Sequence, residues 1–435
     1  MLDNIFETLE IINSFFWSYI GFTLIIACGI YFTIKSNFFQ FRTLKRPRKC
    51  IRDLHESAQK GHDGIHPLKL YFASVGGMVG LGNMVGIIMA LMIGGPGGLF
   101  WLWVASFCGM LIKYGEIYLG VHFRVPNGRG GYDGGPMFYL KEAFRNRYIP
   151  LIVSILLCIY GVEVVQFLII TDTVVKFFAI DKHIVIIGLL AFTLYTGLGG
   201  INRLATICTI LMPVFIIIYV IMCLWVLVNH ASEIPNTLSI VFHSAFNGHA
   251  AVGGFAGSTF VLAAQKGIAQ AVYSGDIGIG YDSIIQAETK TQHPEKQARM
   301  AVFALATDTI ICTMSMLVVL VTKVWHGTDK MQPSEFITKA LGMHFPYIET
   351  FMAIFFFLAG FTTIIAYFSV GIKSSAFIAP KWGRTIYIAY AIFAFSFFSF
   401  FDQNKVMLIM SLSGGFLMML NLMGMIRLRH HIKFH

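Results

Sequence analysis

The chain has 435 residues, of which 56% are hydrophobic and only 12% are charged, and its mean hydropathy is +0.71. Soluble domains carry roughly 25% charged residues, so this composition excludes an ordinary soluble protein and indicates one embedded in a lipid bilayer. The net charge of +10 does not indicate a nucleic-acid-binding protein, because the basic residues gather in alternate loops between apolar segments.

A helix needs about 20 mostly apolar residues to cross the hydrocarbon core of a bilayer, and the chain contains eleven such candidates. They are 15–34, 71–93, 98–120, 150–175, 184–200, 205–228, 248–270, 300–322, 346–372, 385–401 and 405–426. Because helices satisfy their own backbone hydrogen bonds, we expect an all-α integral membrane protein. The expected parts are an extra N-terminal helix in 1–34, a basic loop in 35–70, five-helix halves in 71–228 and 229–426, and a tail in 427–435.

The distribution of Lys and Arg predicts the orientation in the membrane. If the loop 35–70 is cytoplasmic, cytoplasmic loops hold 24 of the 32 Lys and Arg residues, and the opposite loops hold five. This asymmetry places the N-terminus outside and the C-terminus in the cytoplasm. The basic loop is expected to lie on anionic lipid and not on nucleic acid.

The first segment after that loop, YFASVGGMVGLGNMVGIIMALMIGGPG (71–97), is interrupted by glycine in its first half. Gly76, Gly77, Gly80 and Gly82 lie within seven residues, and Asn83 follows directly. Each glycine costs a helix interior roughly 1 kcal/mol relative to alanine. Unwound backbone inside a membrane must face protein or a wet cavity. We therefore predict a discontinuous helix whose freed amides bind a carboxylate and whose freed carbonyls bind a cation.

The segment 248–270 also begins with glycines. FNGHAAVGGFAGS contains Gly248, Gly253, Gly254 and Gly257. Broken segments at corresponding positions of two halves are typical of an inverted repeat with the transport site at its interface. We predict a five-plus-five inverted repeat behind the extra first helix. Close helix packing is the alternative explanation for either glycine cluster.

Several long blocks make the chain similar to the alanine/glycine:cation symporter family. They include VGLGNMVGIIMALMIGGPGGLFWLWVASFCGMLIKYGE, GGPMFYL (134–140), GLGGINRLATICTILMP (197–213), GGFAGSTFVLAAQKGIAQAVYSGDIGIG (253–280), ETKTQHP (288–294) and ATDTIICTM (306–314). The resemblance covers residues from about 20 to 425. It implies the amino acid–polyamine–cation architecture (the LeuT-type fold), a bacterial inner-membrane location, and transport of alanine or glycine driven by sodium. No cofactor is implied other than the coupling ion.

The V-G-L-G-N run also resembles that of the neurotransmitter:sodium symporters. Carried over by position, this resemblance implies a sodium site with five oxygen ligands. They are the carbonyls of Gly76, Val79 and Ala359 and the hydroxyls of Thr362 and Thr363. The alternative is that both threonine hydroxyls bond to carbonyls of their own helix.

The expected substrate site includes the unwound turn and side chains that approach it. Its residues are Met78, Gly80, Leu81, Gly82, Asn83, Glu163, Gln166, Phe255 and Tyr367. The resemblance places a substrate-contacting glutamine at Gln166, whose alternative role is a structural hydrogen bond between helices. Phe255 is expected to cap the pocket, unless it is plain packing.

Glu163 is the most consequential departure from the family pattern, because it replaces the Asn of Gly-Asn-Met-Val-Gln. Leu81, Tyr367 and the S-G-D-I-G-I-G run (274–280) also depart from that pattern. An acid at the centre of a spanning helix is by default functional. Glu163 could bind the substrate ammonium, carry a coupling proton or pair with another cation. Lys113 and Glu116, three residues apart, are expected to pair with each other.

The sequence therefore predicts a secondary transporter that imports small neutral amino acids with sodium. Proton coupling or a divergent amino-acid substrate is the alternative that Glu163 suggests. A sensor or channel that keeps the fold without coupled transport is a further alternative. The sequence has no H-E-x-x-H, G-x-x-x-x-G-K-[ST] or G-x-S-x-G motif, so we do not expect an enzyme or an ATP-driven pump.

Overall fold

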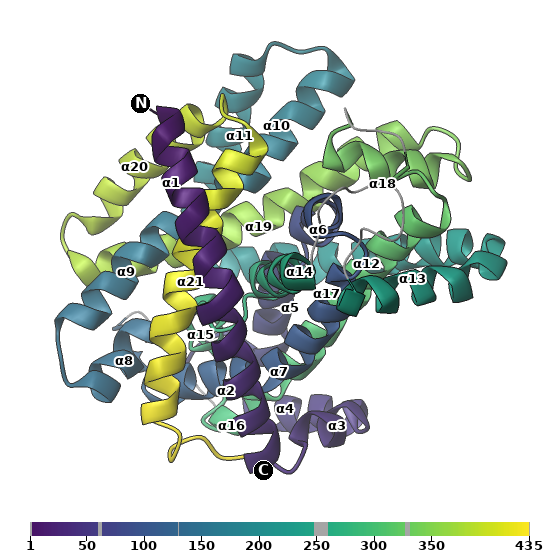
Figure 1. Ribbon diagram of the computed structural model, residues 1–435. Coiled ribbons are helices and arrows are strands. Elements are labelled where there is room, and N and C mark those ends of the chain that lie inside the picture. The colour runs from purple at the N-terminus through teal and green to yellow at the C-terminus, as the bar shows by residue number, and fades with distance from the viewer. Residues whose placement is uncertain (1, 60–62, 129, 248–259, 327–330, 435) are drawn as a thin grey trace.

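The computed structural model describes residues 2–59, 63–128, 130–247, 260–326 and 331–434, and their regular structure is nearly all helical (Figure 1). The elements are α1 (Leu2–Phe15), η1 (Phe16–Gly21), α2 (Phe22–Lys35), α3 (Phe39–Leu44), α4 (Pro47–Gln59), α5 (Pro67–Met78), η2 (Leu81–Asn83), α6 (Gly86–Gly94), α7 (Gly98–His122), β1 (Val125–Pro126), β2 (Tyr132–Asp133), α8 (Pro136–Phe144), α9 (Tyr148–Tyr160), α10 (Val164–Phe178), α11 (Lys182–Gly197), α12 (Gly200–Asn229), η3 (Ala231–Glu233), α13 (Ile234–Asn247), α14 (Phe260–Gly275), α15 (Tyr281–Gln286), α16 (Pro294–Ala298), α17 (Met300–Val321), α18 (Pro333–Gly342), α19 (Ile348–Ile378), α20 (Gly383–Phe398) and α21 (Gln403–Arg427). The strands form one small antiparallel pair. The predicted all-α class is confirmed.

Within the described residues, seven helical stretches are long and apolar enough to cross a membrane. They are Asn4–Lys35, Gly98–His122, Tyr148–Phe178, Gly200–Asn229, Pro294–Val321, Ile348–Ile378 and Gln403–Arg427. A further candidate is the pair Pro67–Met78 and Leu81–Gly94, which is bent by 53°. The helices α11 and α20 are apolar but shorter. The chain is thus a multi-pass membrane protein, while its total number of spans and its inverted repeat stay predictions.

The predicted apolar segments coincide with helices or pairs of helices wherever the chain is described. The first one begins earlier than predicted, because Asn4–Lys35 is helical throughout, with a π-helical turn at η1. The segment 248–270 is described only from Phe260, where α14 begins. Phe255 and the glycines at 248, 253, 254 and 257 lie outside the described residues.

Small residues let the central helices approach closely. The helix α7 packs against α2, α14 and α17. Where α7 meets α14, a Cβ atom on Gly267 would overlap the backbone oxygen of Gly98. Helix association in lipid depends on such close packing, because lipid tails are as apolar as leucine. The glycines at this crossing therefore allow α14 to lie directly against α7.

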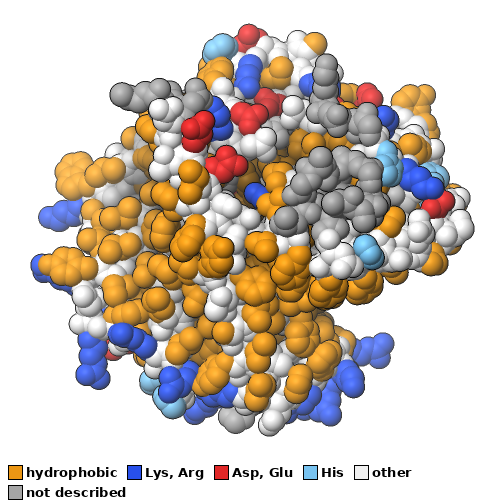
Figure 2. Space-filling model, viewed as in Figure 1, with side chains coloured by type: hydrophobic (Ala, Val, Ile, Leu, Met, Phe, Trp, Pro, Cys, Tyr) orange, Lys and Arg blue, Asp and Glu red, His pale blue; other side chains and the backbone are white. Residues whose placement is uncertain are grey.

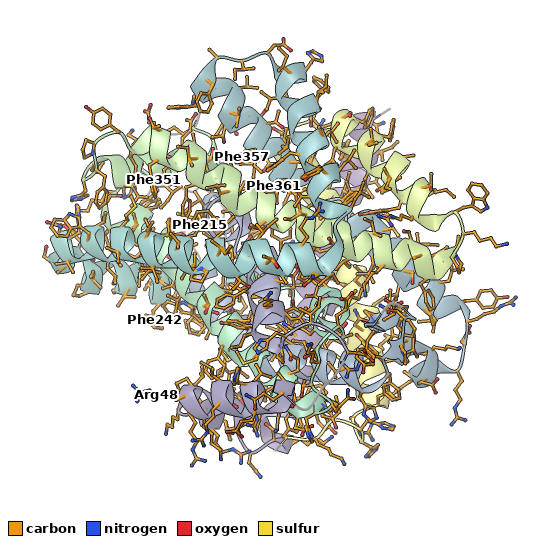
Figure 3. The ribbon with its side chains drawn as sticks, turned by 180° about the vertical axis from the view of Figure 1, so that it is seen from behind. Arg48, Phe215, Phe242, Phe351, Phe357 and Phe361 are labelled. Atoms are coloured by element: carbon orange, nitrogen blue, oxygen red, sulfur yellow. The ribbon has the colours of Figure 1, made fainter. Side chains whose placement is uncertain are left out.

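Charged and apolar side chains are separated along the long direction of the molecule. Figure 2 shows a broad belt of hydrophobic side chains and a gathering of Lys and Arg at the lower end, where Figure 1 places α3, α4 and the C-terminus. The view from behind shows Arg48 at this same end (Figure 3). Aromatic side chains such as Phe357 and Phe361 line α19 above it, and their rings stack. The N-terminus lies at the opposite end from the C-terminus.

Candidate functional site

The helix that begins at Pro67 breaks where the sequence predicted. The helix α5 ends at Met78, Gly80 is extended, and the chain resumes as the short helix η2. Two freed amides have partners: Asn83 Oδ1 accepts from the Gly80 amide at 3.1 Å, and Gln166 Oε1 accepts from the Leu81 amide at 2.9 Å. The predicted residues Gly80, Leu81, Asn83 and Gln166 therefore meet in space, and side chains occupy the amides that were expected to face a carboxylate.

A second layer of polar side chains holds this turn in place. Asn83 Nδ2 donates to Asp308 Oδ1 at 2.5 Å, and Ser274 Oγ donates to Asp308 Oδ2 at 3.3 Å. Gln270 Nε2 donates to the Gly82 carbonyl at 2.8 Å. The break in one segment is thus tied to α14 and α17, which come from the other half of the chain.

Four of the five predicted sodium ligands lie together at the end of α5. Thr363 Oγ1 donates to the Gly76 carbonyl at 3.3 Å and to the Ala359 carbonyl at 3.2 Å. Thr362 Oγ1 donates to the Ala359 carbonyl at 2.8 Å. Val79 lies in the break itself, with its amide bonded to Val75. Both threonines bond within their own helix, as the alternative predicted, and Thr363 also reaches across to α5.

Within the described residues, the second half of the chain breaks after Gly275, while the glycines that the sequence singled out lie outside the described residues. The helix α14 ends there, and α15 begins at Tyr281. Asp276, Gly278 and Gly280 in the gap have φ values of 49°, 74° and 103°, a region that favours glycine. Asn421 Nδ2 donates to the freed carbonyls of Gly278 and Ile279 at 2.9 and 2.8 Å. The G-D-I-G-I-G spacing was the sequence signal for this break.

A buried lysine of α7, Lys113, links the end of α14 to the start of α15 at this second break. Lys113 Nζ lies 2.5 Å from Asp282 Oδ2, and both side chains are fully buried. Lys113 also donates to the Gly275 carbonyl at 2.7 Å, which is the last carbonyl of α14, and Ser74 donates to Asp282 at 2.5 Å. The predicted pairing of Lys113 with Glu116 is wrong. Glu116 accepts instead from the Ser283 amide at 3.4 Å, because α15 packs against α7 at this level.

A third break contains Glu163, which is not in the middle of a helix as the sequence suggested. The helix α9 ends at Tyr160 and α10 begins at Val164, so Glu163 occupies the position before the first turn of α10. Its Oε1 accepts from the Tyr273 hydroxyl of α14 at 2.6 Å. The long apolar run around it hid this break, because its Gly161 alone did not predict one.

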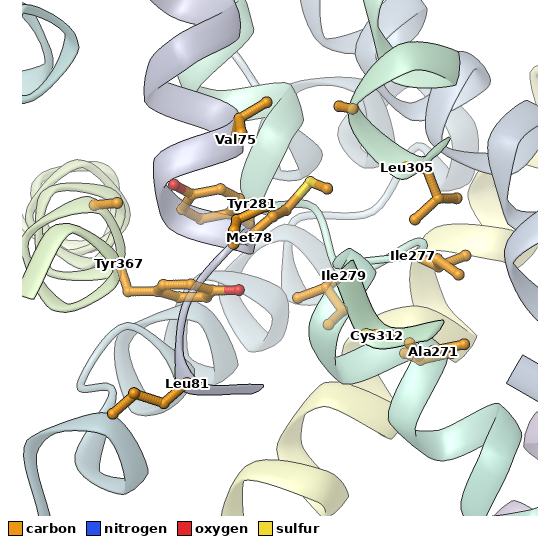
Figure 4. Close-up of a cluster of buried hydrophobic side chains, with 14 of the residues drawn as sticks. Val75, Met78, Leu81, Ala271, Ile277, Ile279, Tyr281, Leu305, Cys312 and Tyr367 are labelled. Atoms are coloured by element: carbon orange, nitrogen blue, oxygen red, sulfur yellow. The ribbon is translucent and has the colours of Figure 1, made fainter. Parts of the chain in front are cut away.

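Tyrosine rings fill the space between the three breaks. Tyr367 of α19 donates its hydroxyl to Asp276, and its ring stacks on Tyr281 with centroids 4.4 Å apart. The Tyr160 ring lies 5.4 Å from that of Tyr367. In Figure 4, Tyr367 extends between Met78 and Tyr281 on one side and Leu81 on the other. The predicted residues Met78 and Tyr367 therefore belong to one buried cluster, with Tyr160, Tyr281 and Asp276 as members that the sequence did not predict.

A cavity of about 910 Å³ leads from the N-terminal end of the molecule toward these tyrosines. Its lining includes the buried residues Tyr160, Gln270 and Ile279 and the half-buried Tyr273. Charged side chains on its walls are Glu7, Glu10, Lys266, Asp402 and Lys405. Figure 2 shows acidic and basic side chains around a hollow in the upper half of the molecule. The extra N-terminal helix thus forms one wall of a vestibule that ends at the tyrosine that contacts Glu163.

Comparisons with known proteins give a consistent result. A family model described as "Sodium:alanine symporter family" matches residues 2–434. The amino-acid carrier protein AlsT of Bacillus subtilis is 28% identical over 87% of this chain and 80% of its own length. The sodium/alanine symporter AgcS of Methanococcus maripaludis is 27% identical over 88% of this chain and 86% of its own length. A crystal structure of a mutant of the Eremococcus coleocola manganese transporter has a similar fold, with a TM-score of 0.51 and 14% identity, covering 80% of this chain and 75% of that one.

Proposed function

This chain belongs to the sodium:alanine symporter family, a family of transporters and not of enzymes, and from that premise we propose that it imports small neutral amino acids such as alanine or glycine together with sodium. The observation that carries the proposal is the break after Met78, where freed amides lie in space beside a cluster of uncharged oxygens from α5 and α19. Such a break can serve an anionic group and a cation at once.

In this proposal sodium binds among the Gly76, Val79 and Ala359 carbonyls and the Thr362 and Thr363 hydroxyls. Four of these groups already contact one another. A hydroxyl that donates to a carbonyl can rotate and offer its lone pairs to a cation. The hydrogen bonds seen here are therefore compatible with ion binding and would be exchanged for it.

The substrate carboxylate would bind the Gly80 and Leu81 amides, and Gln166, Asn83 and Tyr367 would surround the rest of the molecule. The vestibule supports access from the side where the N-terminus lies, which we take as the outside of a bacterial inner membrane. We propose that the two five-helix halves alternate access around the breaks, with the C-terminus in the cytoplasm. The basic loop on α3 and α4 would then contact anionic lipid.

One observation favours a second possibility. Glu163 is buried, and its Oε2 has no hydrogen-bond partner among the described residues. A carboxyl group in such a place can take up a proton or a positively charged ligand. Proton coupling or a divergent amino-acid substrate is thus the alternative to sodium-driven alanine transport.

Uptake of radiolabelled alanine and glycine into proteoliposomes tests the proposal. We expect accumulation when an inward sodium gradient is imposed, and no accumulation when potassium replaces sodium. Accumulation with a proton gradient alone would favour the alternative. Absence of uptake under both gradients, with correctly folded protein, would reject small neutral amino acids as substrates.

A further inference from the structure

Glu163 has an environment suited to a positive charge that none of the described residues supplies. Its carboxyl group is 1% exposed, and one oxygen accepts from the Tyr273 hydroxyl while the other has no partner among the described residues. The first turn of α10 follows directly, so the partial positive charge of the helix N-terminus favours an anion here. A buried carboxylate nevertheless stays costly until a full positive charge pairs with it.

No Lys, Arg or His of the described residues pairs with Glu163. Lys113, which is fully buried, is held by Asp282 at the other break. Among the described residues, the titratable neighbours of Glu163 are phenols: Tyr160 from α9, Tyr273 from α14 and Tyr367 from α19. Neutral phenols leave the charge of Glu163 unbalanced, and Tyr273 offers it only one hydrogen bond.

We propose that Glu163 and the surrounding tyrosines form a subsite for an ammonium group on the substrate side chain. Short diamino acids would then bind more tightly than neutral amino acids with the same carbon skeleton. The inference rests on the proposed function, because it assumes that an amino acid enters between the breaks, but it gives the preferred amino acid a positively charged side chain in place of the neutral one proposed above. A carboxylate and an ammonium form a charge-assisted hydrogen bond, which is stronger than a bond between neutral groups.

The route to this subsite supports the same assignment. The vestibule ends at Tyr160 and Tyr273, and Tyr273 touches Glu163 directly. Acidic residues outnumber basic ones on its walls, where Glu7, Glu10 and Asp402 stand against Lys266 and Lys405. A cleft with an excess of negative charge raises the local concentration of cations.

Matched ligand pairs test the subsite on the purified, sodium-bound protein. Binding is measured by calorimetry for 2,4-diaminobutyrate against 2-aminobutyrate, and for ornithine against norvaline. We expect the diamino member of a pair to bind about tenfold more tightly or better, which corresponds to about 1.4 kcal/mol. Glu163→Gln should bring the ratio close to one, and Glu163→Asn should do the same. The matched control is Glu233→Gln. Glu233 lies on η3 and pairs with Lys323, away from the subsite, so this variant should keep the wild-type ratio of affinities.

The outcomes separate this inference from the proposed function. Equal affinities within each pair in the wild type would overturn the subsite while leaving amino-acid transport in place. Uptake of neutral substrate driven by protons and lost in Glu163→Gln, with no preference for diamino acids, would assign Glu163 to a proton instead. Failure of every amino acid to bind or to be taken up would reject the proposed function itself. If Glu163→Gln does not fold, the ratio in the wild type still decides.

Discussion

The ion pair between Lys113 and Asp282 gives the sharpest prediction about stability. Both side chains are fully buried and their charged atoms lie 2.5 Å apart. Removing one partner of a buried pair typically costs about 3–5 kcal/mol, because the other charge is left uncompensated. Lys113→Gln would leave Asp282 with only the Ser74 hydroxyl, and Asp282→Asn would leave Lys113 with only backbone carbonyls. We expect each single substitution to destabilise the protein by that amount.

The double variant Lys113→Gln/Asp282→Asn should be more stable than either single variant. Because the pair itself is then neutral on both sides, the remaining loss is mainly that of neutral hydrogen bonds, about 1–3 kcal/mol. The coupling between the two sites should therefore be favourable by about 3 kcal/mol or more, at the upper end for residues in contact. Lys113 also caps the last carbonyl of α14, where a helix end favours a cation, so part of the loss will remain.

Thermal unfolding of the detergent-purified variants provides the assay. We expect the highest Tm for the wild type, a lower Tm for the double variant and the lowest Tm values for the two single variants. The control is Lys323→Gln, because this lysine pairs with Glu233 through partly exposed side chains, and such pairs contribute about 0–1 kcal/mol. Additive losses in the double variant would refute the reasoning, since they would mean that the two charges do not compensate each other in the fold.

Three further predictions concern the first break and the start of α5, the helix that leads into it. Thr363→Val should raise the half-saturating sodium concentration about tenfold, because it removes a hydroxyl from the proposed cation ligands. Thr363→Ser keeps the hydroxyl and should not raise this concentration. Equal sodium dependence of the wild type and both variants would remove Thr363 from the site. Gly80→Ala should destabilise the protein by about 1–3 kcal/mol and abolish uptake, because a Cβ atom there would overlap Thr363 Oγ1. The control is Gly188→Ala on α11, where a Cβ atom meets nothing within 4 Å and should change neither property. A Gly80→Ala variant that still transports would contradict this account of the packing. Burial, with help from nearby His55, lowers the pKa of His66 below its ordinary 6.5, and the neutral ring caps α5 by accepting the Leu68 amide. His66 therefore binds a proton more tightly in the unfolded chain than in the folded protein. The cap contributes about 1 kcal/mol to the stability of the fold. This contribution is complete above pH 6.5 and is lost as the pH falls toward the pKa of His66 in the folded protein. His66→Asn should flatten that part of the Tm profile, and an unchanged profile would exclude the cap.

The features that the sequence predicted well are those with a local cause. Gly80 and Gly82 cost helix stability where they stand, so the break between α5 and η2 could be placed to within a residue or two. The apolar segments followed from the length that a bilayer demands. Thr362 and Thr363 were selected because their neighbours resemble a known pattern; Thr363 does contact the Gly76 carbonyl, and the role of both threonines stays a prediction.

The features that the sequence missed depend on contacts between distant parts of the chain. The break after Gly275 was not predicted, because the conformation of Gly278 and Gly280, which have positive φ, depends on the helices packed around them. Lys113 was paired with its neighbour Glu116 because spacing along one helix was the only information available. Its true partner, Asp282, comes from an element that docks on α7 through tertiary packing.

The proposed sodium and substrate sites share one short stretch of backbone, and this sharing supplies a physical route for coupling. Thr363 contacts the Gly76 carbonyl in the last turn of α5, and the Gly80 and Leu81 amides follow within a few residues. A cation that binds the carbonyl end of α5 would fix the position of these amides. A substrate carboxylate that binds afterwards would then lose less free energy in ordering these amides, because sodium has already ordered them. Linkage requires the effect to be reciprocal, so substrate should tighten sodium binding by the same factor. The Gln166 and Asn83 oxygens that hold the amides here must give way to the substrate, so shortening either side chain should weaken the coupling as well as the binding.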